Sequence, residues 1–273
     1  MPSPLRKPPR ILAIAGSDSG GGAGIQADIK TITRLGGHAM TAITAITAQD
    51  TLGVKAIHPI PAEMVLAQIE VVAADIGIDA IKIGMIGSAE AAQAIAGALD
   101  ALEGVPVVFD PVMVATSGDR LASSETIARF EPLMARSTLI TPNCDELRVL
   151  SGRGIASEDE IGEAARAIVA EFGCAVLATG WQSPREPPEL VDLLFAPTRR
   201  ERFLGTRINT IHDHGTGCTL SSAIASGLGA GLPLADAISR GRAFVRACLL
   251  AAPGFGAGHG PMGHAAAEIN PDF

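Results

Sequence analysis

The segment His-Gly-Thr-Gly-Cys at residues 214–218 combines a thiol with glycines just ahead of an apolar, helix-forming stretch. If a helix begins there, its first N–H groups can bind a transferring phosphoryl group, because the glycines leave them open. The positive helix end is expected to lower the pKa of Cys218, so that its thiolate can take the proton of a substrate hydroxyl. The alternative, a small buried apolar residue, is favoured for the other three cysteines but not for Cys218.

A second motif, Asp110-Pro111-Val112-Met113, follows the apolar run Val105–Phe109. In an open parallel sheet, ligands bind beyond the carboxyl ends of the strands. A carboxylate there can hold Mg²⁺, directly or through water. Taken alone, the motif fits an aspartate that caps a turn equally well.

The third motif is Thr-Pro-Asn-Cys-Asp-Glu at residues 141–146, again just after an apolar run. Asn143 and Glu146 are three residues apart, so a helix that starts there places them on one face. By itself this spacing favours a capping box, with Asn143 as N-cap, over a functional site.

A glycine-rich loop at residues 15–24 links the first apolar run to a helical pattern. Such a loop lets a ligand approach the backbone and meet helix-terminal N–H groups. Its glycines fit the dinucleotide-binding register poorly, which argues against a nicotinamide-dependent oxidoreductase, and it lacks the Gly-Lys-Ser/Thr of a Walker A loop. Asp28, on the following helix, is expected to project back toward the same pocket.

Neither the cysteines nor the histidines have the spacing of a metal site, so the histidines are interpreted as loop residues. The residues concerned are Cys144, Cys174, Cys218, Cys248, His212, His214, His259 and His264.

The elements that must position these motifs alternate along the chain. Apolar runs predict strands at 11–15, 39–46, 80–83, 105–109, 138–140, 175–178 and 190–195. Helical patterns lie at 25–35, 62–74, 89–102, 124–134 and 158–172, with two more helices between 217 and 250. This alternation predicts a three-layer α/β/α sandwich with a mainly parallel central sheet. We expect a flexible tail over residues 1–10 and a single domain over 11–273, with a hairpin around the polar loop Gln182–Glu189.

Charge and hydropathy exclude several classes of function. The net charge is −8 and no run of Lys or Arg offers a surface for nucleic acid. The first apolar run, Ile11–Ala15, is too short to cross a membrane or to direct secretion. The chain is therefore expected to act in the cytoplasm on a small molecule, with its cysteines reduced.

Taken together, the motifs resemble the hydroxymethylpyrimidine/phosphomethylpyrimidine kinases of thiamine biosynthesis, a branch of the ribokinase-like superfamily. The resemblance covers about residues 11–261. It rests on six blocks in order: AGSDSGGGAGIQADIKT, TAITAQDTLGV, IKIGMIGS, DPVMVATSG, LITPNCDEL and HGTGCTLSSAIA.

This resemblance implies a ribokinase-like fold, ATP and Mg²⁺ as cofactors, a homodimer, and a role for each matching residue. Substrate-binding roles fall on Gly16, Ala23, Asp28, Gln49, Met85 and Val112, with Gln49 pairing with the ring and amino groups of the pyrimidine. Asp110 and Glu146 would organise Mg²⁺, with Asn143 and Thr179 beside the nucleotide. Gly215, Thr216 and Gly217 would form the anion hole, and Cys218 would be the base where many relatives carry Asp.

Two departures from the family pattern bear on function. The usual Lys-Gly-Gly-His, whose lysine lies near the ATP phosphates, is replaced by Thr179-Gly180-Trp181-Gln182, and Arg185 or Arg207 are candidate substitutes for the lost cation. The usual Gln-Asn-Thr is Gln49-Asp50-Thr51, which adds a negative charge near the pocket. Two alternatives therefore stay open: a pyridoxal or pyridoxine kinase on the same fold, and a non-catalytic pyrimidine sensor.

Overall fold

The computed structural model describes residues 7–182 and 189–268, and the strands found there form one sheet. In spatial order they are β3 (Gly53–Pro59), β2 (His38–Asp50), β1 (Arg10–Asp18), β4 (Ala80–Ile83), β5 (Val107–Phe109), β6 (Leu139–Ile140), β7 (Ala175–Gln182), β8 (Glu189–Ala196) and β9 (Arg199–Thr206). The pairs from β2 across to β7 are parallel, whereas β3, β8 and β9 pair antiparallel at the two edges.

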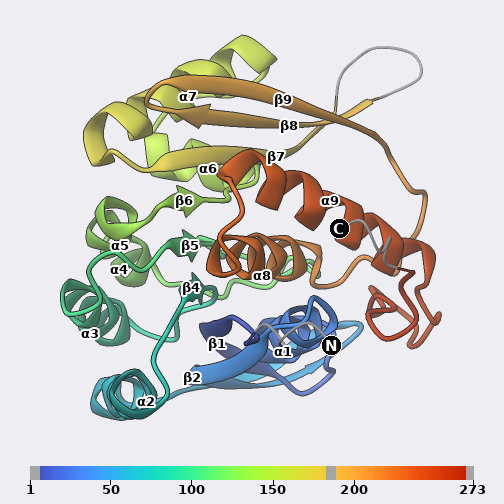
Figure 1. Cartoon of the computed structure of the whole chain (residues 1–273). Coiled ribbons are helices and arrows are strands. Elements are labelled where there is room, and N and C mark those ends of the chain that lie inside the picture. The colour runs from blue at the N-terminus through green and yellow to red at the C-terminus, as the bar shows by residue number, and fades with distance from the viewer. Residues whose placement is uncertain (1–6, 183–188, 269–273) are drawn as a thin grey trace, which may run out of the picture.

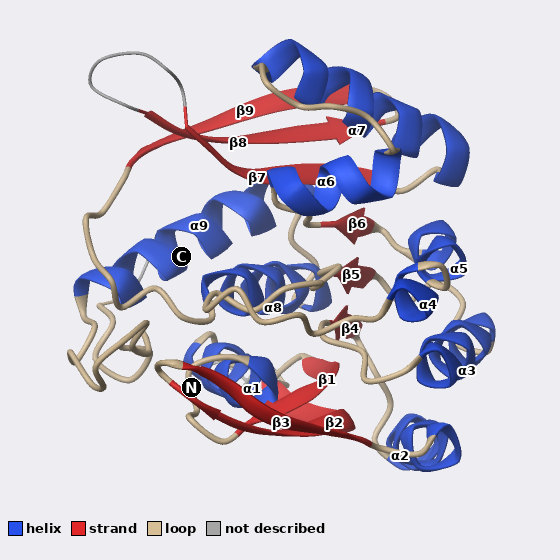
Figure 2. Cartoon of the chain, turned by 180° about the vertical axis from the view of Figure 1, so that it is seen from behind, coloured by secondary structure: helices blue, strands red, loops and turns tan. Residues whose placement is uncertain are grey.

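Helices cover both faces of this sheet (Figures 1 and 2). One face carries α1 (Gly24–Arg34), α8 (Thr216–Gly229) and α9 (Leu234–Leu250). The other carries α2 (Ala62–Asp75), α3 (Ala89–Asp100), α4 (Ser124–Ile127), α5 (Phe130–Arg136), α6 (Cys144–Ser151) and α7 (Glu158–Phe172). The expected three-layer α/β/α sandwich with a mainly parallel sheet is confirmed.

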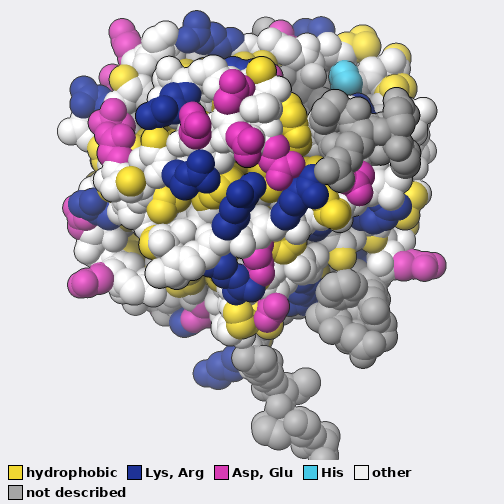
Figure 3. All heavy atoms as spheres, turned by 90° about the horizontal axis from the view of Figure 1, so that it is seen from above, with side chains coloured by type: hydrophobic (Ala, Val, Ile, Leu, Met, Phe, Trp, Pro, Cys, Tyr) yellow, Lys and Arg dark blue, Asp and Glu magenta, His cyan; other side chains and the backbone are white. Residues whose placement is uncertain are grey.

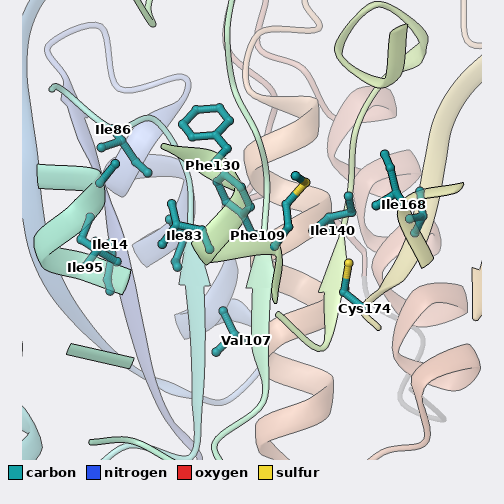
Figure 4. Packing of buried hydrophobic residues seen from close by; sticks show 14 of the residues in the cluster. Ile14, Ile83, Ile86, Ile95, Val107, Phe109, Phe130, Ile140, Ile168 and Cys174 are labelled. Carbon is teal, nitrogen blue, oxygen red and sulfur yellow. The ribbon is translucent and has the colours of Figure 1, made fainter. Parts of the chain in front are cut away.

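The central strands β4 and β5 are apolar except for Lys82, because helices bury both faces of the sheet. Every residue of β4 and β5 is buried. Phe109 of β5 meets Phe130 of α5 edge to face, with ring centroids 5.1 Å apart (Figure 4). Because the central strands run parallel, their carboxyl ends lie together at one end of the sheet.

Several elements differ from the sequence expectation, and three of the differences have a clear physical reason. β1 already begins at Arg10, whose N–H and guanidinium bind Asp79, so the expected tail is shorter; its residues 1–6 lie outside the described part. The expected helix 124–134 is broken in two, because Pro132 lacks an N–H and fits only the first turn of α5. Strand β3 was not expected, since exposed polar residues interrupt its apolar pattern.

The antiparallel hairpin expected around the polar loop is confirmed: β7 and β8 pair antiparallel on either side of it, and β9 adds antiparallel to β8, although residues 183–188 of the loop lie outside the described part. β9 is the edge strand, and charge keeps it from pairing further. Arg202 and Arg200 contact Glu158 of α7 at 3.1 and 3.6 Å. Figure 3 shows basic and acidic side chains intermixed on the face that carries these elements.

Candidate active site

A cavity of about 750 Å³ opens where β1, β4, β5 and β6 end. Its walls are the loops that follow these strands, the end of β2, part of β7 and the start of α8. Ligands bind at this edge in open parallel sheets. Most residues selected from the sequence line it: Gly16, Ala23, Gln49, Met85, Asp110, Val112, Asn143, Glu146, Thr179, Gly215, Thr216, Gly217 and Cys218.

The turn at residues 215–218 begins α8 and packs against the glycine-rich turn before α1. Gly215 has a φ of 86°, a left-handed conformation that favours glycine, and a Cβ there would collide with the carbonyl oxygen of Gly22. The N–H of Thr219 donates to the Gly215 carbonyl at 2.9 Å, the first bond of the helix. The N–H groups of a helix's first turn have no partners within the helix, so an anion in the cavity can use them.

The pKa of Cys218 is raised, whereas the sequence predicts that it is lowered. Burial in the cavity wall raises it to about 12; Lys82 lowers it, but Asp28 and Asp110 raise it further. The partial charge at the end of α8 is too small to offset this desolvation. The expected lowering of the Cys218 pKa is therefore wrong, and its surroundings favour the thiol over the thiolate.

Asp28 does not line the cavity, contrary to the expectation. Its side chain is fully buried under the site, where the Lys82 ammonium donates to its two oxygens at 2.8 and 3.0 Å. Ser222 of α8 donates to the same carboxylate at 2.6 Å. Burial lowers the pKa of Lys82, but the charge of its partner Asp28, together with that of Asp110, outweighs it and raises the pKa. The pair therefore ties α1 to β4 and α8 behind the cavity wall, and its two charges balance one another.

Asp110, directly after β5, and Glu146, in the first turn of α6, both line the cavity. Asp110 accepts hydrogen bonds from Thr141 and Ser221, both at 3.3 Å. Burial raises the pKa of Asp110 against the pull of Lys82. Burial, and then the charge of Asp110, raise the pKa of Glu146 to about 8. Two desolvated carboxyl groups that repel one another have the chemistry of a site for a divalent cation.

The capping box predicted for Asn143 and Glu146 is confirmed. Asn143 Oδ1 accepts from the N–H of Asp145 and Glu146, and Glu146 Oε2 accepts from the N–H of Asn143, all at 2.9 Å. Asn143 and Glu146 therefore cap α6 and also form part of the cavity wall. Thr179 lies beside them, its N–H bound to the Pro142 carbonyl at 2.9 Å.

The opposite end of the cavity is more apolar. A Cβ on Gly16 would lie 2.9 Å from the Met85 sulfur, so the absence of a side chain there leaves room for Met85. Thr44 donates to the Met85 carbonyl at 2.6 Å and fixes the loop after β4. The Asp50 carboxylate accepts from the N–H groups of Leu52 and Gly53 in the turn to β3, so its hydrogen bonds stabilise that turn.

Sequence reasoning missed several residues in the cavity wall or directly behind it. His214, interpreted as a loop histidine, lines the cavity beside Asp18. Lys82 carried a detectable signal, because a lysine inside the buried run Ala80–Ile83 needs a buried partner. Arg120 also lines the cavity, whereas Arg207 does not and Arg185 is outside the described residues.

Within residues 7–182 and 189–268, no three His, Cys, Asp or Glu side chains gather as a metal-binding group. In the same part of the chain, no helix is long and apolar enough to span a membrane.

Comparison with known proteins identifies the family. Residues 18–263 match the family model described as phosphomethylpyrimidine kinase. A hydroxymethylpyrimidine/phosphomethylpyrimidine kinase of Rhizobium meliloti is 45% identical over 257 residues, covering 93% of this chain and 96% of the relative.

Two solved structures extend the comparison to the fold. The ADP complex of a Bacillus subtilis pyridoxal kinase superposes with a TM-score of 0.86 at 33% identity, covering 96% of this chain and 99% of that one. A phosphomethylpyrimidine kinase of Clostridium difficile 630 gives 0.77 at 35% identity, covering 87% and 97%. The match of the family model over most of the length, with the ribokinase-like kinases as structural neighbours, shows that this chain belongs to the phosphomethylpyrimidine kinase family.

Proposed function

We propose that this chain transfers a phosphoryl group from ATP to 4-amino-5-hydroxymethyl-2-methylpyrimidine, and then to its monophosphate, in thiamine biosynthesis. One observation carries the proposal: a helix-terminal turn, a carboxylate pair and a partly apolar pocket share the wall of one cavity. Phosphoryl transfer needs this combination, because it depends on positioning and charge stabilisation more than on covalent help from the protein. We further propose that residues 11–273 act as one catalytic domain, in the cytoplasm and as a homodimer.

The heterocycle is proposed to bind between Gly16, Gln49, Met85 and Val112. Met85 and Val112 offer apolar surface to the ring, and the Gln49 amide offers a donor and an acceptor to its polar edge. The hydroxymethyl group would then reach toward the turn at residues 215–218. Ala23, from the glycine-rich turn, closes this part of the wall, while Asp28 stays beneath it.

Asp110 and Glu146 are the residues that would hold Mg²⁺, directly or through its waters. Their desolvated and mutually repelling carboxyl groups fit a divalent cation, which would offset the charge of the ATP phosphates. Asn143 keeps Glu146 in place through the capping box.

The N–H groups at the start of α8 are proposed to bind the transferred phosphoryl group. Cys218 lies in the same turn and is proposed to accept the proton of the substrate hydroxyl. Because its pKa is raised, this role requires loss of the thiol proton first, so activity should rise with pH.

Thr179 is proposed to lie beside the nucleotide, in the position where the family resemblance implies a lysine. Loss of that cation is expected to weaken ATP binding. Arg120 is the one Lys or Arg among the described residues lining the cavity, although its guanidinium already binds Ala122 and Ser124.

A pyridoxal kinase activity is the second candidate, and the similarity to the Bacillus subtilis pyridoxal kinase favours it. The test is steady-state ATP consumption with hydroxymethylpyrimidine, its monophosphate and pyridoxal, for the wild type and Cys218→Ala. Turnover of both pyrimidines is expected. A preference for pyridoxal would change the substrate, and pyrimidine binding without turnover would instead indicate a sensor.

A further inference from the structure

Three polar side chains from distant parts of the chain meet on the cavity wall. Nε2 of His214 lies 3.2 Å from an Asp18 carboxylate oxygen and 2.6 Å from the Gln49 side-chain amide. All three residues line the cavity, and His214 directly precedes the Gly215 turn. The contact therefore joins the pocket for the heterocycle to the turn that begins α8.

The charge state of Asp18 determines which ring nitrogen of His214 carries a hydrogen. Its carboxylate accepts from the N–H groups of Gly20, Gly22 and Ala23 at 2.8, 2.9 and 2.8 Å. Burial raises the pKa of Asp18, but the bond with His214 and those from the backbone outweigh it and hold the pKa below its usual value. An ionised carboxylate only accepts hydrogen bonds, so the nitrogen of His214 that faces it must carry a hydrogen.

A hydrogen on Nε2 of His214 also determines the orientation of the Gln49 amide. If the amide nitrogen of Gln49 faced His214, two N–H donors would meet at 2.6 Å, which is unfavourable. A half-turn about the last side-chain bond exchanges the amide oxygen and nitrogen at this position. The oxygen then accepts from the Nε2–H of His214, which it shares with the Asp18 carboxylate in a three-centre hydrogen bond, and the amide NH₂ is free to turn toward the cavity.

We propose that His214, held with its Nε2–H toward Asp18, is a positioning residue that fixes the orientation of the Gln49 amide and thereby the donor and acceptor order read by the pocket. The imidazole is itself held by its backbone. The His214 N–H donates to the Gly260 carbonyl at 3.2 Å, and Gly22 has no Cβ to collide with the ring.

The consequence for specificity rests on the proposed function. A fixed amide offers NH₂ as donor and one remaining lone pair of its oxygen as acceptor. The aminopyrimidine edge is complementary, because its ring nitrogen accepts and its amino group donates. The 4-oxo analogue of the same pyrimidine reverses this order, with a ring N–H that donates and a carbonyl that accepts. A fixed Gln49 rejects that analogue, whereas a free one turns over and accepts it.

The first measurement uses no substrate. ¹⁵N-edited NMR of the full chain, with His214 assigned by its loss in His214→Gln, detects the one-bond N–H coupling at Nε2. We expect hydrogen on Nε2. A bare Nε2 with hydrogen on Nδ1 would overturn the proposal, whatever reaction the protein catalyses.

The second measurement is calorimetric binding of the hydroxymethylpyrimidine and of its 4-oxo analogue. In His214→Phe, which keeps a ring but has no N–H, the preference for the amino form should fall roughly tenfold, the effect of one misplaced hydrogen bond. His214→Gln, which can still donate, should keep most of the preference, and exposed His38→Gln is the control. Equal weakening of both ligands in His214→Phe would mean a merely structural role and would refute the proposal. If the wild type bound neither pyrimidine, the proposed function would fail instead, while the NMR result would still decide the role of His214.

Discussion

Glutamine at position 146 removes the ionisable group from the carboxylate pair but keeps an oxygen for the Asn143 N–H. Glu146 is 7% exposed, so solvent screens its charge little. Its pKa rises from an ordinary 4.5 to about 8 on folding, through burial and the charge of Asp110. Between these values the folded chain holds a proton that the unfolded chain has lost, so stability falls as pH rises.

The size of the effect follows from the pKa shift. From pH 6 to pH 8 the wild type should lose about 3 kcal/mol through Glu146, at about 1.4 kcal/mol per unit of pH, and nothing further above the folded pKa. Glu146→Gln should lack this loss. Urea unfolding near pH 6 and pH 9 measures it, with the exposed Glu63→Gln on α2 as control. Mg²⁺ should recover stability at the higher pH in the wild type but much less in Glu146→Gln. If both chains lost stability equally between the two pH values, the buried and repelling pair would be refuted.

Three further predictions follow from the contacts beneath and around the turn. Gly215→Ala should abolish kinase activity, because the added Cβ would collide with the Gly22 backbone. The control is Gly36→Ala, at a φ of 82° but in open space, which should lower the free energy of unfolding in urea by about 1 kcal/mol and leave activity intact. Equal activities of the two variants would show that the turn is not needed for catalysis. Lys82→Met should cost about 3–5 kcal/mol of unfolding free energy by leaving Asp28 buried alone, and adding Asp28→Leu should recover much of it; additive losses would contradict the buried ion pair. At saturating Mg²⁺, kcat of the wild type should rise about tenfold per pH unit near neutral pH, whereas kcat of Cys218→Ala should be low and independent of pH. A wild-type kcat that does not change with pH would exclude the thiol as the base.

The sequence could predict the layers and most strands because burial on both faces leaves an unbroken apolar run. It could not predict β3, which lies at the sheet edge and is half exposed, so that Lys55 and His58 interrupt its pattern. The break between α4 and α5 was foreseeable from Pro132, whose position inside a helix pattern was overlooked.

The motifs at the ends of the strands were predictable because each carries its own turn chemistry. What they face was not, since that depends on contacts between distant segments. Asp28 was expected in the pocket from its place in the chain, but Lys82, 54 residues away, holds it underneath. The pKa of Cys218 was misjudged for the same reason: the helix end is visible in the sequence, whereas the desolvation that outweighs it is a property of the packed wall.

Phosphoryl transfer to the hydroxymethyl group of a pyrimidine is tested most directly by identifying the product. The chain is incubated with Mg²⁺, ATP labelled at its γ-phosphate and hydroxymethylpyrimidine, and the products are separated and analysed by mass spectrometry. We expect labelled pyrimidine monophosphate, followed by the diphosphate. Label released only as inorganic phosphate, with the pyrimidine recovered unchanged, would contradict it.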